Sequence, residues 1–249
     1  MNRFLTKVLM ACSLISSPVL ADDMGIDDPS RNAYYEALKG KNVVFVPLAL
    51  GFDLTDGWYA GMKADLEPLG VNMQVRDPNW SADAGARAIS SLIGEKPDLI
   101  VVHNPDVQTY AKLLKKAEKR GIHVVQINMK SAYSTDAFVG ADYIEIGELA
   151  GQAIVDNCGD GTSGEVAIVQ GVLTAAASAY QLRGVSNILS KHSNIKIVSN
   201  QAADWDSSKA RTITETTLQQ NPNLCGIIGF WDGMDVGVGA AVHLNASSK

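Results

Sequence analysis

The sequence predicts an α/β fold with two Rossmann-like lobes, each a parallel sheet flanked by helices. Three observations predict it. Short runs rich in Val and Ile are apolar nearly throughout, as strands buried on both faces are. Amphipathic stretches of about 10–15 residues separate these runs, which is the alternation of parallel strands with crossover helices. The alternation is interrupted once, after residue 128, which indicates the passage from a first sheet to a second.

Each element is expected from a local signal. Strands are expected at NVVFVPLAL (42–50), VNMQVRD (71–77), DLIVVH (98–103), IHVVQIN (122–128), EVAIVQG (165–171), IKIVSN (195–200) and CGIIGF (225–230). Helices are expected at 56–70, 81–95, 106–121 and 206–222, where apolar residues recur every three or four positions. Ser81 and Asp106 stand where helix N-caps belong, and Gly70, Gly94 and Gly121 stand where helices are expected to end.

The interruption is the segment SAYSTDAFVGADYIEIGE (131–148). It contains a short strand, AFVGAD, and then a new helix that begins at Tyr143. We therefore expect an N-terminal α/β lobe over residues 22–141 and a C-terminal α/β lobe over residues 142–249.

The first 21 residues have the order of a secretory signal peptide. Arg3 and Lys7 precede the apolar run VLMACSLISSPVL, and a small-residue cleavage site ends at Ala21. The run is well below the ~20 residues that span a bilayer. A lipoprotein box ending at Cys12 is the alternative; it is disfavoured because Met10 is bulky for that motif and the apolar run continues. We expect cleavage after Ala21 and an exported protein.

The chain that remains after cleavage is acidic and has two cysteines. Loss of two basic residues leaves 19 basic against 27 acidic side chains, a formal charge of −8. An acidic exported protein is a poor candidate for nucleic acid, so no such partner is expected. In an oxidising compartment Cys158 and Cys225 can pair or remain as buried free thiols, and the composition alone leaves both possibilities open.

Cofactor and catalytic motifs find no support in the sequence. The stretch GDGTSG (159–164) has the letters of a dinucleotide-binding loop, but it follows an expected helix and precedes an expected strand, the reverse of that motif. We interpret it as a helix-to-strand turn. The sequence has no phosphate-loop, zinc-protease or hydrolase-elbow motif, and its four histidines lie far apart. We expect no cofactor, no metal and no enzymatic activity.

Aromatic and polar side chains gather after the expected strands, at the edge where open parallel sheets bind ligands. The stretches are GFDLTDGWY, HNPD, NMKSAY, TAAASAYQ, AADWD and FWDGMD, and they include Asp53, Trp58, Trp205, Trp231 and Asp232. Indole faces suit the C–H groups of a sugar or polyol, while amides and carboxylates suit its hydroxyls. The alternative is that Trp58 or Trp205 covers a seam between lobes or closes the edge of a core.

Four stretches together resemble the periplasmic sugar-binding proteins of ABC transporters, of the ribose-binding type. They are VVHNPD followed by KKAEKRGIHVVQIN, FVGADYIEIGELAG, VAIVQG with QLRGV, and QAADWDSSKARTITETTLQQNPNLCGIIGFWDGMDVGVGAA. The resemblance implies two lobes, joined by hinge strands, that close on a sugar. It also implies a membrane permease that recognises the closed form, and we expect the binding protein itself to be a monomer.

The resemblance also implies roles for single residues. Trp205 stands where the family places a stacking aromatic, and Asp232 stands on the acid that follows the final site strand. Trp231 replaces an asparagine that contacts the ligand. Asn128 and Gln181 stand where the family has an acid and an arginine, so we expect them to bind hydroxyls as neutral groups. Met129 stands in the place of a second family arginine, so the resemblance implies that both guanidinium groups are absent here. A polyol, a cyclitol or an unusual sugar is therefore expected rather than ribose.

Two further expectations depend on the resemblance. In this fold Cys158 and Cys225 lie at the edge away from the cleft on neighbouring elements, so the resemblance implies that they form a disulfide. The family also continues with further strands beyond the residues that match, so the C-terminal lobe is expected to be incomplete at Lys249.

Two other classes of function stay open. The same fold can present a bound ligand to a chemoreceptor or sensor kinase. An exported carbohydrate-active enzyme could use Asp53, Asp56 or Asp232 as acid and base, although nothing in the sequence places two of these carboxylates at glycosidase spacing.

Overall fold

The computed structural model describes residues 31–247, and the expected signal peptide, residues 1–21, lies outside them. The contacts between residues divide the chain into two compact units, with the boundary after Ala37. The described part of the first unit is helix α1 (Arg31–Leu38) without its last residue. The second unit, from Leu38 onward, contains two parallel sheets. Within residues 31–247 no helix has both the length and the apolar composition that crossing a membrane needs.

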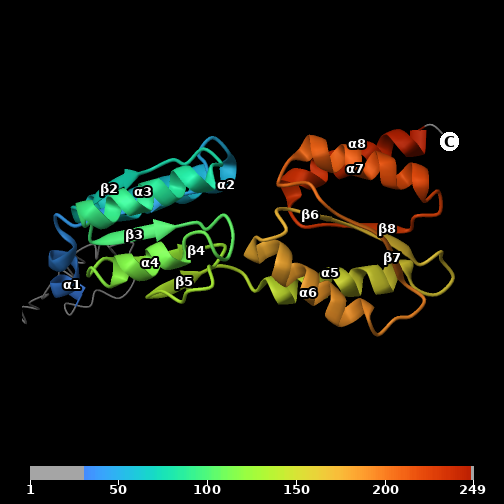
Figure 1. The fold of residues 1–249 in the computed structure, drawn as a ribbon, viewed down its shortest axis with the longest axis horizontal. Helices are drawn as coiled ribbons and strands as arrows, with labels where there is room; N and C mark the ends of the chain where they lie inside the picture. The colour runs from blue at the N-terminus through green and yellow to red at the C-terminus, as the bar shows by residue number, and fades with distance from the viewer. Residues whose placement is uncertain (1–30, 248–249) are drawn as a thin grey trace, which may run out of the picture. The chain divides into compact units, whose positions relative to one another are not determined.

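Five parallel strands form the first sheet, in the order β2-β1-β3-β4-β5 (Figure 1). The strands are β1 (Asn42–Val46), β2 (Asn72–Val75), β3 (Leu99–Val102), β4 (His123–Ile127) and β5 (Ala137–Val139). Val44, Ile100 and Val124 face one side of this sheet, and Phe45 and Val101 face the other, and all five are buried. Burial on both faces explains why these strands are apolar nearly throughout.

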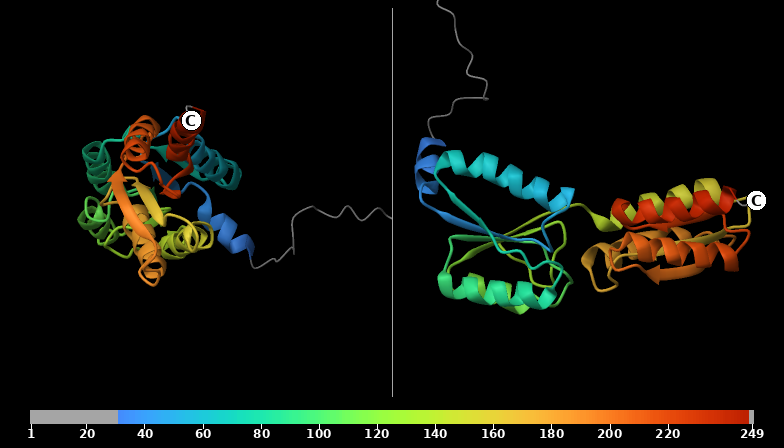
Figure 2. Two further views of the ribbon diagram at one scale, coloured as in Figure 1. Left: turned by 90° about the vertical axis from the view of Figure 1, so that its right-hand side faces the viewer. Right: turned by 90° about the horizontal axis from the view of Figure 1, so that it is seen from above.

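Helices cover both faces of the first sheet (Figure 2). They are α2 (Asp53–Leu66), continued by the short 3-10 helix η1 (Glu67–Leu69), α3 (Ala82–Glu95) and α4 (Ala111–Glu118). Leu92 of α3 and Leu114 of α4 pack with Ile100 in one core cluster. Tyr59 and Met62 of α2 pack on the opposite face.

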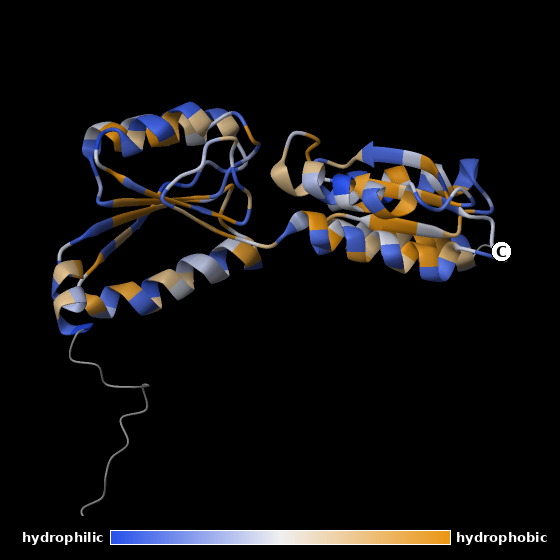
Figure 3. Ribbon diagram, turned by 90° about the horizontal axis from the view of Figure 1, so that it is seen from below, coloured by the Kyte–Doolittle hydropathy of each residue, from blue (hydrophilic) through white to orange (hydrophobic). Residues whose placement is uncertain are grey.

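Three parallel strands form the second sheet, in the order β7-β6-β8. The strands are β6 (Glu165–Gln170), β7 (Lys196–Ala202) and β8 (Gly226–Gly229), and the helices are α5 (Tyr143–Cys158), α6 (Ala176–Leu189), α7 (Ser207–Gln220) and α8 (Asp232–Ser247). Helices α5 and α6 contribute to one core cluster and α7 and α8 to the other, on opposite faces of the sheet. Figure 3 shows apolar residues along most of the strands, and apolar residues alternating with polar ones along the helices.

Most local signals predicted these elements correctly, and two did not. The Ser81 side chain accepts a hydrogen bond from the Ala84 N–H and caps α3, as expected. Asp106 accepts from the Gln108 N–H at 2.7 Å, but α4 begins only at Ala111, so this carboxylate caps an isolated turn. Gly94 does not end α3, because the left-handed C-cap is Lys96, with φ 56°.

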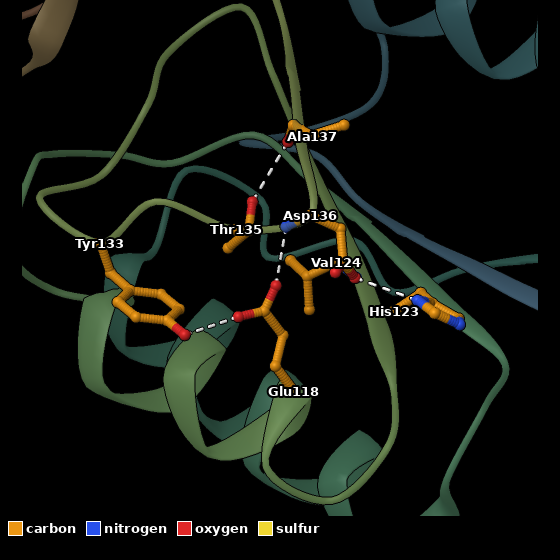
Figure 4. Close-up of polar contacts among 7 residues, drawn as sticks. All are labelled: Glu118, His123, Val124, Tyr133, Thr135, Asp136 and Ala137. Carbon is orange, nitrogen blue, oxygen red and sulfur yellow. Dashed lines mark hydrogen bonds and ion pairs between the residues drawn. The ribbon is translucent and has the colours of Figure 1, made fainter.

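A polar network holds the connection between β4 and β5 (Figure 4). Glu118 at the end of α4 accepts hydrogen bonds from the Tyr133 hydroxyl at 2.7 Å and from the Asp136 N–H at 2.8 Å. The Asp136 carboxylate in turn accepts from the Val124 N–H at 3.0 Å and contacts His123 Nδ1 at 3.1 Å. The segment that follows β4 is therefore fixed to α4 and to the neighbouring strand.

The backbones of α5 and α6 approach so closely that glycine is required at the contact. A Cβ at Gly184 would lie 2.0 Å from the Ile144 carbonyl oxygen, and one at Gly147 would lie 2.1 Å from the Gln181 carbonyl oxygen. Gly184→Ala is expected to lower the free energy of unfolding by about 2 kcal/mol or more, because two helices would have to separate.

Urea-induced unfolding monitored by circular dichroism measures that loss. Gly61→Ala is the matched control, since a Cβ at this position in α2 meets no atom within 4 Å. It is expected to raise the free energy of unfolding by about 0.5–1 kcal/mol through helix propensity alone. Equal effects of the two substitutions would contradict the close approach of α5 and α6.

The stretch GDGTSG between α5 and β6 is a helix-to-strand turn, as predicted.

Cys158 at the end of α5 and Cys225 before β8 form a disulfide, with Cα atoms 5.7 Å apart. The disulfide spans 67 residues of sequence. A bond that closes such a long loop restricts the unfolded chain strongly. Removal of the disulfide is therefore expected to lower the free energy of unfolding by roughly 2–4 kcal/mol.

Dithiothreitol is therefore expected to lower the free energy of unfolding of the natural sequence by that amount, measured in urea. The double variant Cys158→Ala, Cys225→Ala is expected to unfold at the lowered urea midpoint and to show no response to dithiothreitol. Mass spectrometry that finds two alkylatable thiols in the oxidised protein would be evidence against the disulfide.

Candidate functional site

A cavity of about 240 Å³ lies where the carboxyl ends of strands from both sheets supply its walls. We name it the aromatic cavity. It is lined by Leu48, Phe52, Leu54, Trp80, His103, Asn128, Met129, Tyr143, Ala177, Trp205, Phe230, Trp231 and Asp232. Six of these residues are Phe, Tyr or Trp, although such residues make up 6% of the chain. None of these described lining residues is Lys or Arg, so the lining supplies no permanent cation.

Four aromatic rings form a continuous series along the cavity. The rings of Trp80 and Phe52 stack, with centroids 5.2 Å apart and an interplanar angle of 24°. Phe52 meets Trp231 edge to face at 6.3 Å, and Trp231 meets Trp205 edge to face at 6.2 Å. These are favourable aromatic geometries, so each ring helps to hold the next in place.

Backbone geometry sets the position of Trp205. Asp204 and Trp205 both have positive φ, at 54° and 63°, a conformation that costs energy in residues other than glycine and often marks functional sites. The Ala203 N–H donates to the Gln170 carbonyl at 2.8 Å and ties this turn to the end of β6. A Cβ at Gly171 would lie 2.1 Å from the indole, so glycine is needed for the ring to pack against the backbone there.

Asn128 is the centre of a polar group in the same wall. Its Oδ1 accepts a hydrogen bond from the Tyr143 hydroxyl at 2.5 Å. Its Nδ2 donates to His103 Nε2 at 3.2 Å, which assigns the proton of the neutral imidazole to Nδ1. One N–H of the amide remains for a ligand hydroxyl. The left-handed backbone of Asn128, with φ 57°, is a conformation that asparagine adopts more readily than most residues.

Burial controls the charges of His103 and Tyr143. His103 is 2% exposed, and loss of hydration lowers its pKa to about 3, so the ring is neutral at physiological pH. Burial raises the pKa of Tyr143 against the opposing effect of its hydrogen bond to Asn128. The phenol therefore remains a donor. The polar part of this wall consists of neutral groups with fixed hydrogen-bond directions.

Asp232 supplies the one carboxylate among the described residues that line the cavity. It is the first residue of α8, and its Oδ1 accepts from the Gly233 N–H at 2.8 Å. The positive end of the helix dipole favours a carboxylate there. One turn later, burial and the charge of Asp232 raise the pKa of Asp235. Among the described lining residues, Asp232 thus supplies the carboxyl oxygens that can accept hydrogen bonds from a ligand.

The structure brings four of the seven predicted ligand-binding residues together. Asn128, Trp205, Trp231 and Asp232 all line the aromatic cavity. The other three, Asp53, Trp58 and Gln181, do not line it.

Each of these three side chains has another environment. Gln181 is 5% exposed, and its Nε2 donates to the Phe230 carbonyl at 3.3 Å, so the amide holds the backbone behind the cavity. Trp58 packs on the sheet and meets His103 edge to face at 5.4 Å. Asp53 begins α2 and is exposed.

The lining also contains polar and aromatic residues that were not among the predicted site residues: Phe52, Trp80, His103, Tyr143 and Phe230. Trp80 follows β2, so the rule that ligands bind at the carboxyl ends of strands would have identified it if applied to the second strand. His103 also follows β3, but a histidine at such a position often has only a structural role, so the sequence did not single it out. Nothing local marks Tyr143, because its role depends on contact with Asn128.

Comparison with known proteins gives a consistent result. A family model described as a periplasmic binding protein domain matches residues 43–249. The D-allose-binding periplasmic protein of Escherichia coli strain K12 is 36% identical over 135 residues, 51% of this chain and 43% of that protein. The ribose import binding protein of Bacillus subtilis strain 168 is 25% identical over 190 residues, 76% of this chain and 60% of that protein. This chain thus spans between 43% and 60% of the length of these relatives.

Solved structures show the same architecture. An ABC transporter solute-binding protein from Burkholderia graminis C4D1M, in complex with D-arabinose, superposes with a TM-score of 0.76 at 26% identity. The match covers 82% of this chain and 71% of that one. Together with the two helix-flanked parallel sheets, it confirms the predicted fold class.

Proposed function

This chain belongs to the periplasmic binding protein family, and on that premise we propose that it binds a small sugar or polyol in the periplasm and delivers it to the permease of an ABC transporter. The relatives described above are named as binding proteins for allose and ribose. In the proposal the two lobes, residues 22–141 and 142–249, close on the ligand, and no chemical reaction follows.

The single observation that carries this proposal is the composition of the aromatic cavity. Trp205 and Trp231 offer indole surface for the C–H groups of a ligand ring. The Asn128 amide and the Asp232 carboxylate offer a donor and an acceptor to its hydroxyls. A polyhydroxylated molecule has both kinds of surface, whereas a purely apolar ligand would leave these two polar groups unpaired, at a cost of about 1–3 kcal/mol each.

We further propose that the ligand carries no negative charge. The described lining has no Lys or Arg to pair with a carboxylate or phosphate, and Asp232 would repel one. Neutral sugars, linear polyols and cyclitols satisfy this condition. Closure of the lobes would remove water from the Asn128 and Asp232 hydrogen bonds, which makes a wrongly placed hydroxyl costly and the site selective.

A thermal-shift screen of the full chain tests the proposed function. The panel contains neutral pentoses, hexoses, linear polyols and cyclitols, each matched where possible by an acid such as D-glucuronate. A ligand present at about 100 times its Kd stabilises the folded state by about 2.7 kcal/mol. That corresponds to a rise in Tm of roughly 5–10 °C for a chain of this size. A panel in which no neutral compound raises Tm would count against the proposal.

A further inference from the structure

A second cavity adjoins the aromatic cavity and is larger. Its volume is about 630 Å³, and Leu48, Trp80 and Trp205 line both cavities. Small-molecule sites usually occupy roughly 300–1,000 Å³, so the aromatic cavity is small for a complete site and the second cavity is not. The two together offer continuous room for a ligand longer than one sugar ring.

The two shared indoles come from equivalent places in the two sheets. Trp80 lies in DPNWSAD between β2 and α3, and Trp205 lies in AADWDSS between β7 and α7. Each follows a residue of positive φ, has positive φ itself (67° and 63°) and precedes the N-cap of its helix. The same unfavourable backbone conformation at matched positions indicates that both indoles are held at the boundary of the cavities for a purpose.

The phenol hydroxyl of Tyr110 is a polar group of the second cavity that is available to a ligand. The residue is 1% exposed and lines this cavity, and its hydroxyl makes no hydrogen bond with any residue between 31 and 247. The hydroxyl is not among the described buried polar atoms that lack a partner, so water reaches it, and a ligand hydroxyl in this cavity can take the place of that water. The oxygen lies against α3, since a Cβ at Gly85 would come within 1.7 Å of it. Burial, followed by the charges of Asp106 and Asp83, raises the pKa of Tyr110 to about 12, so the phenol is a donor.

Other polar groups of this cavity are partly engaged already. One carboxylate oxygen of Asp206 accepts from the Lys209 N–H at 2.9 Å, and Asp204 pairs with the Lys209 ammonium at 3.2 Å. The hydroxyls of Ser207 and Ser208 form no side-chain hydrogen bond within the described residues. The second cavity therefore combines serine hydroxyls with the phenol of Tyr110, which suits a second hydroxylated unit.

We propose that the ligand is a two-unit glycoside of disaccharide size. One ring lies in the aromatic cavity, and the glycosidic link passes between the indoles of Trp80 and Trp205. The second unit lies in the second cavity, where Tyr110 donates a hydrogen bond to one of its hydroxyls. This inference rests on the proposed function and makes it more specific, since Tyr110 lines the second cavity and not the aromatic cavity.

Isothermal titration of the full chain tests the inference with matched probes. Cellobiose, lactose and xylobiose are titrated beside D-glucose, D-galactose and D-xylose. At least one disaccharide is expected to bind tenfold or more tightly than either of its monosaccharides. Tyr110→Phe keeps the buried ring and is expected to lower the ratio of disaccharide to monosaccharide affinity about fivefold to tenfold, the value of one hydrogen bond. Tyr59→Phe, a matched change outside both cavities, is expected to keep the ratio.

The outcomes separate this inference from the proposed function. Monosaccharides or polyols that bind as tightly as every disaccharide would overturn the two-unit ligand and leave the binding role intact. A preference for a disaccharide that survives Tyr110→Phe undiminished would overturn the role of Tyr110. Failure of all six sugars, and of the wider panel of neutral compounds, would overturn both.

Discussion

Lowering the pH from 6.5 towards 3 is expected to destabilise the folded chain by about 3–5 kcal/mol through one residue, His103. Burial lowers the folded-state pKa of this imidazole to about 3 from an ordinary value of 6.5. Between these values the unfolded chain binds a proton that the folded chain does not bind. The unfolded state is therefore favoured as the pH falls, and above pH 6.5 the effect is absent.

Urea unfolding at about pH 7.5, 5.5 and 4.5, values on both sides of the ordinary imidazole pKa, measures this effect. His103→Gln removes the titrating ring and retains an amide that can accept from Asn128, so its stability is expected to depend less on pH across this range. His243→Gln, an exposed position on α8, is the matched control for loss of an imidazole. Identical pH dependence of the natural sequence and His103→Gln would argue against a buried neutral histidine.

Trp205→Ala is expected to weaken ligand binding by about tenfold to a hundredfold. The substitution removes an indole that lines both cavities and meets Trp231 edge to face. Burying an aromatic surface against a ligand is worth about 1.5–3 kcal/mol, and each ~1.4 kcal/mol is a factor of ten in Kd. Isothermal titration with the compound that gives the largest thermal shift measures the loss.

Trp205→Phe separates the loss of aromatic surface from a change in the fold. It is expected to bind with an affinity between those of the natural sequence and Trp205→Ala, because a smaller ring covers less of the ligand. The same urea midpoint for all three proteins would show that the fold is retained. If Trp205→Ala binds as tightly as the natural sequence, the indole is not part of the binding site.

The strands and helices could be predicted from the sequence because their signals are local. Val44, Ile100 and Ile168 need no distant partner to identify them as residues of buried strands, since the apolar runs around them do so. Helix ends were less certain, as Asp106 shows. An Asp can cap a helix or an isolated turn with the same two N–H groups, and the sequence does not distinguish them.

The site was predictable as a region and less so residue by residue. Trp205 and Asp232 lie shortly after strands, and that position brings them to the cavity. Gln181 and Trp58 lie within helices, so their direction depends on how each helix packs. Gln181 faces the Phe230 carbonyl, and Trp58 faces the sheet. The hydrogen bond between Tyr143 and Asn128 joins separate elements and could be seen only in the folded chain.

The disulfide also determines how the protein responds to a protease. The bond between Cys158 and Cys225 encloses β6, α6, β7 and α7 in a covalent ring, while Trp231 and Asp232 lie beyond it along the chain. A single cut within the ring leaves both fragments attached to each other. The part of the aromatic cavity that follows Cys225 would thus remain tethered to the part that precedes Cys158 after such a cut.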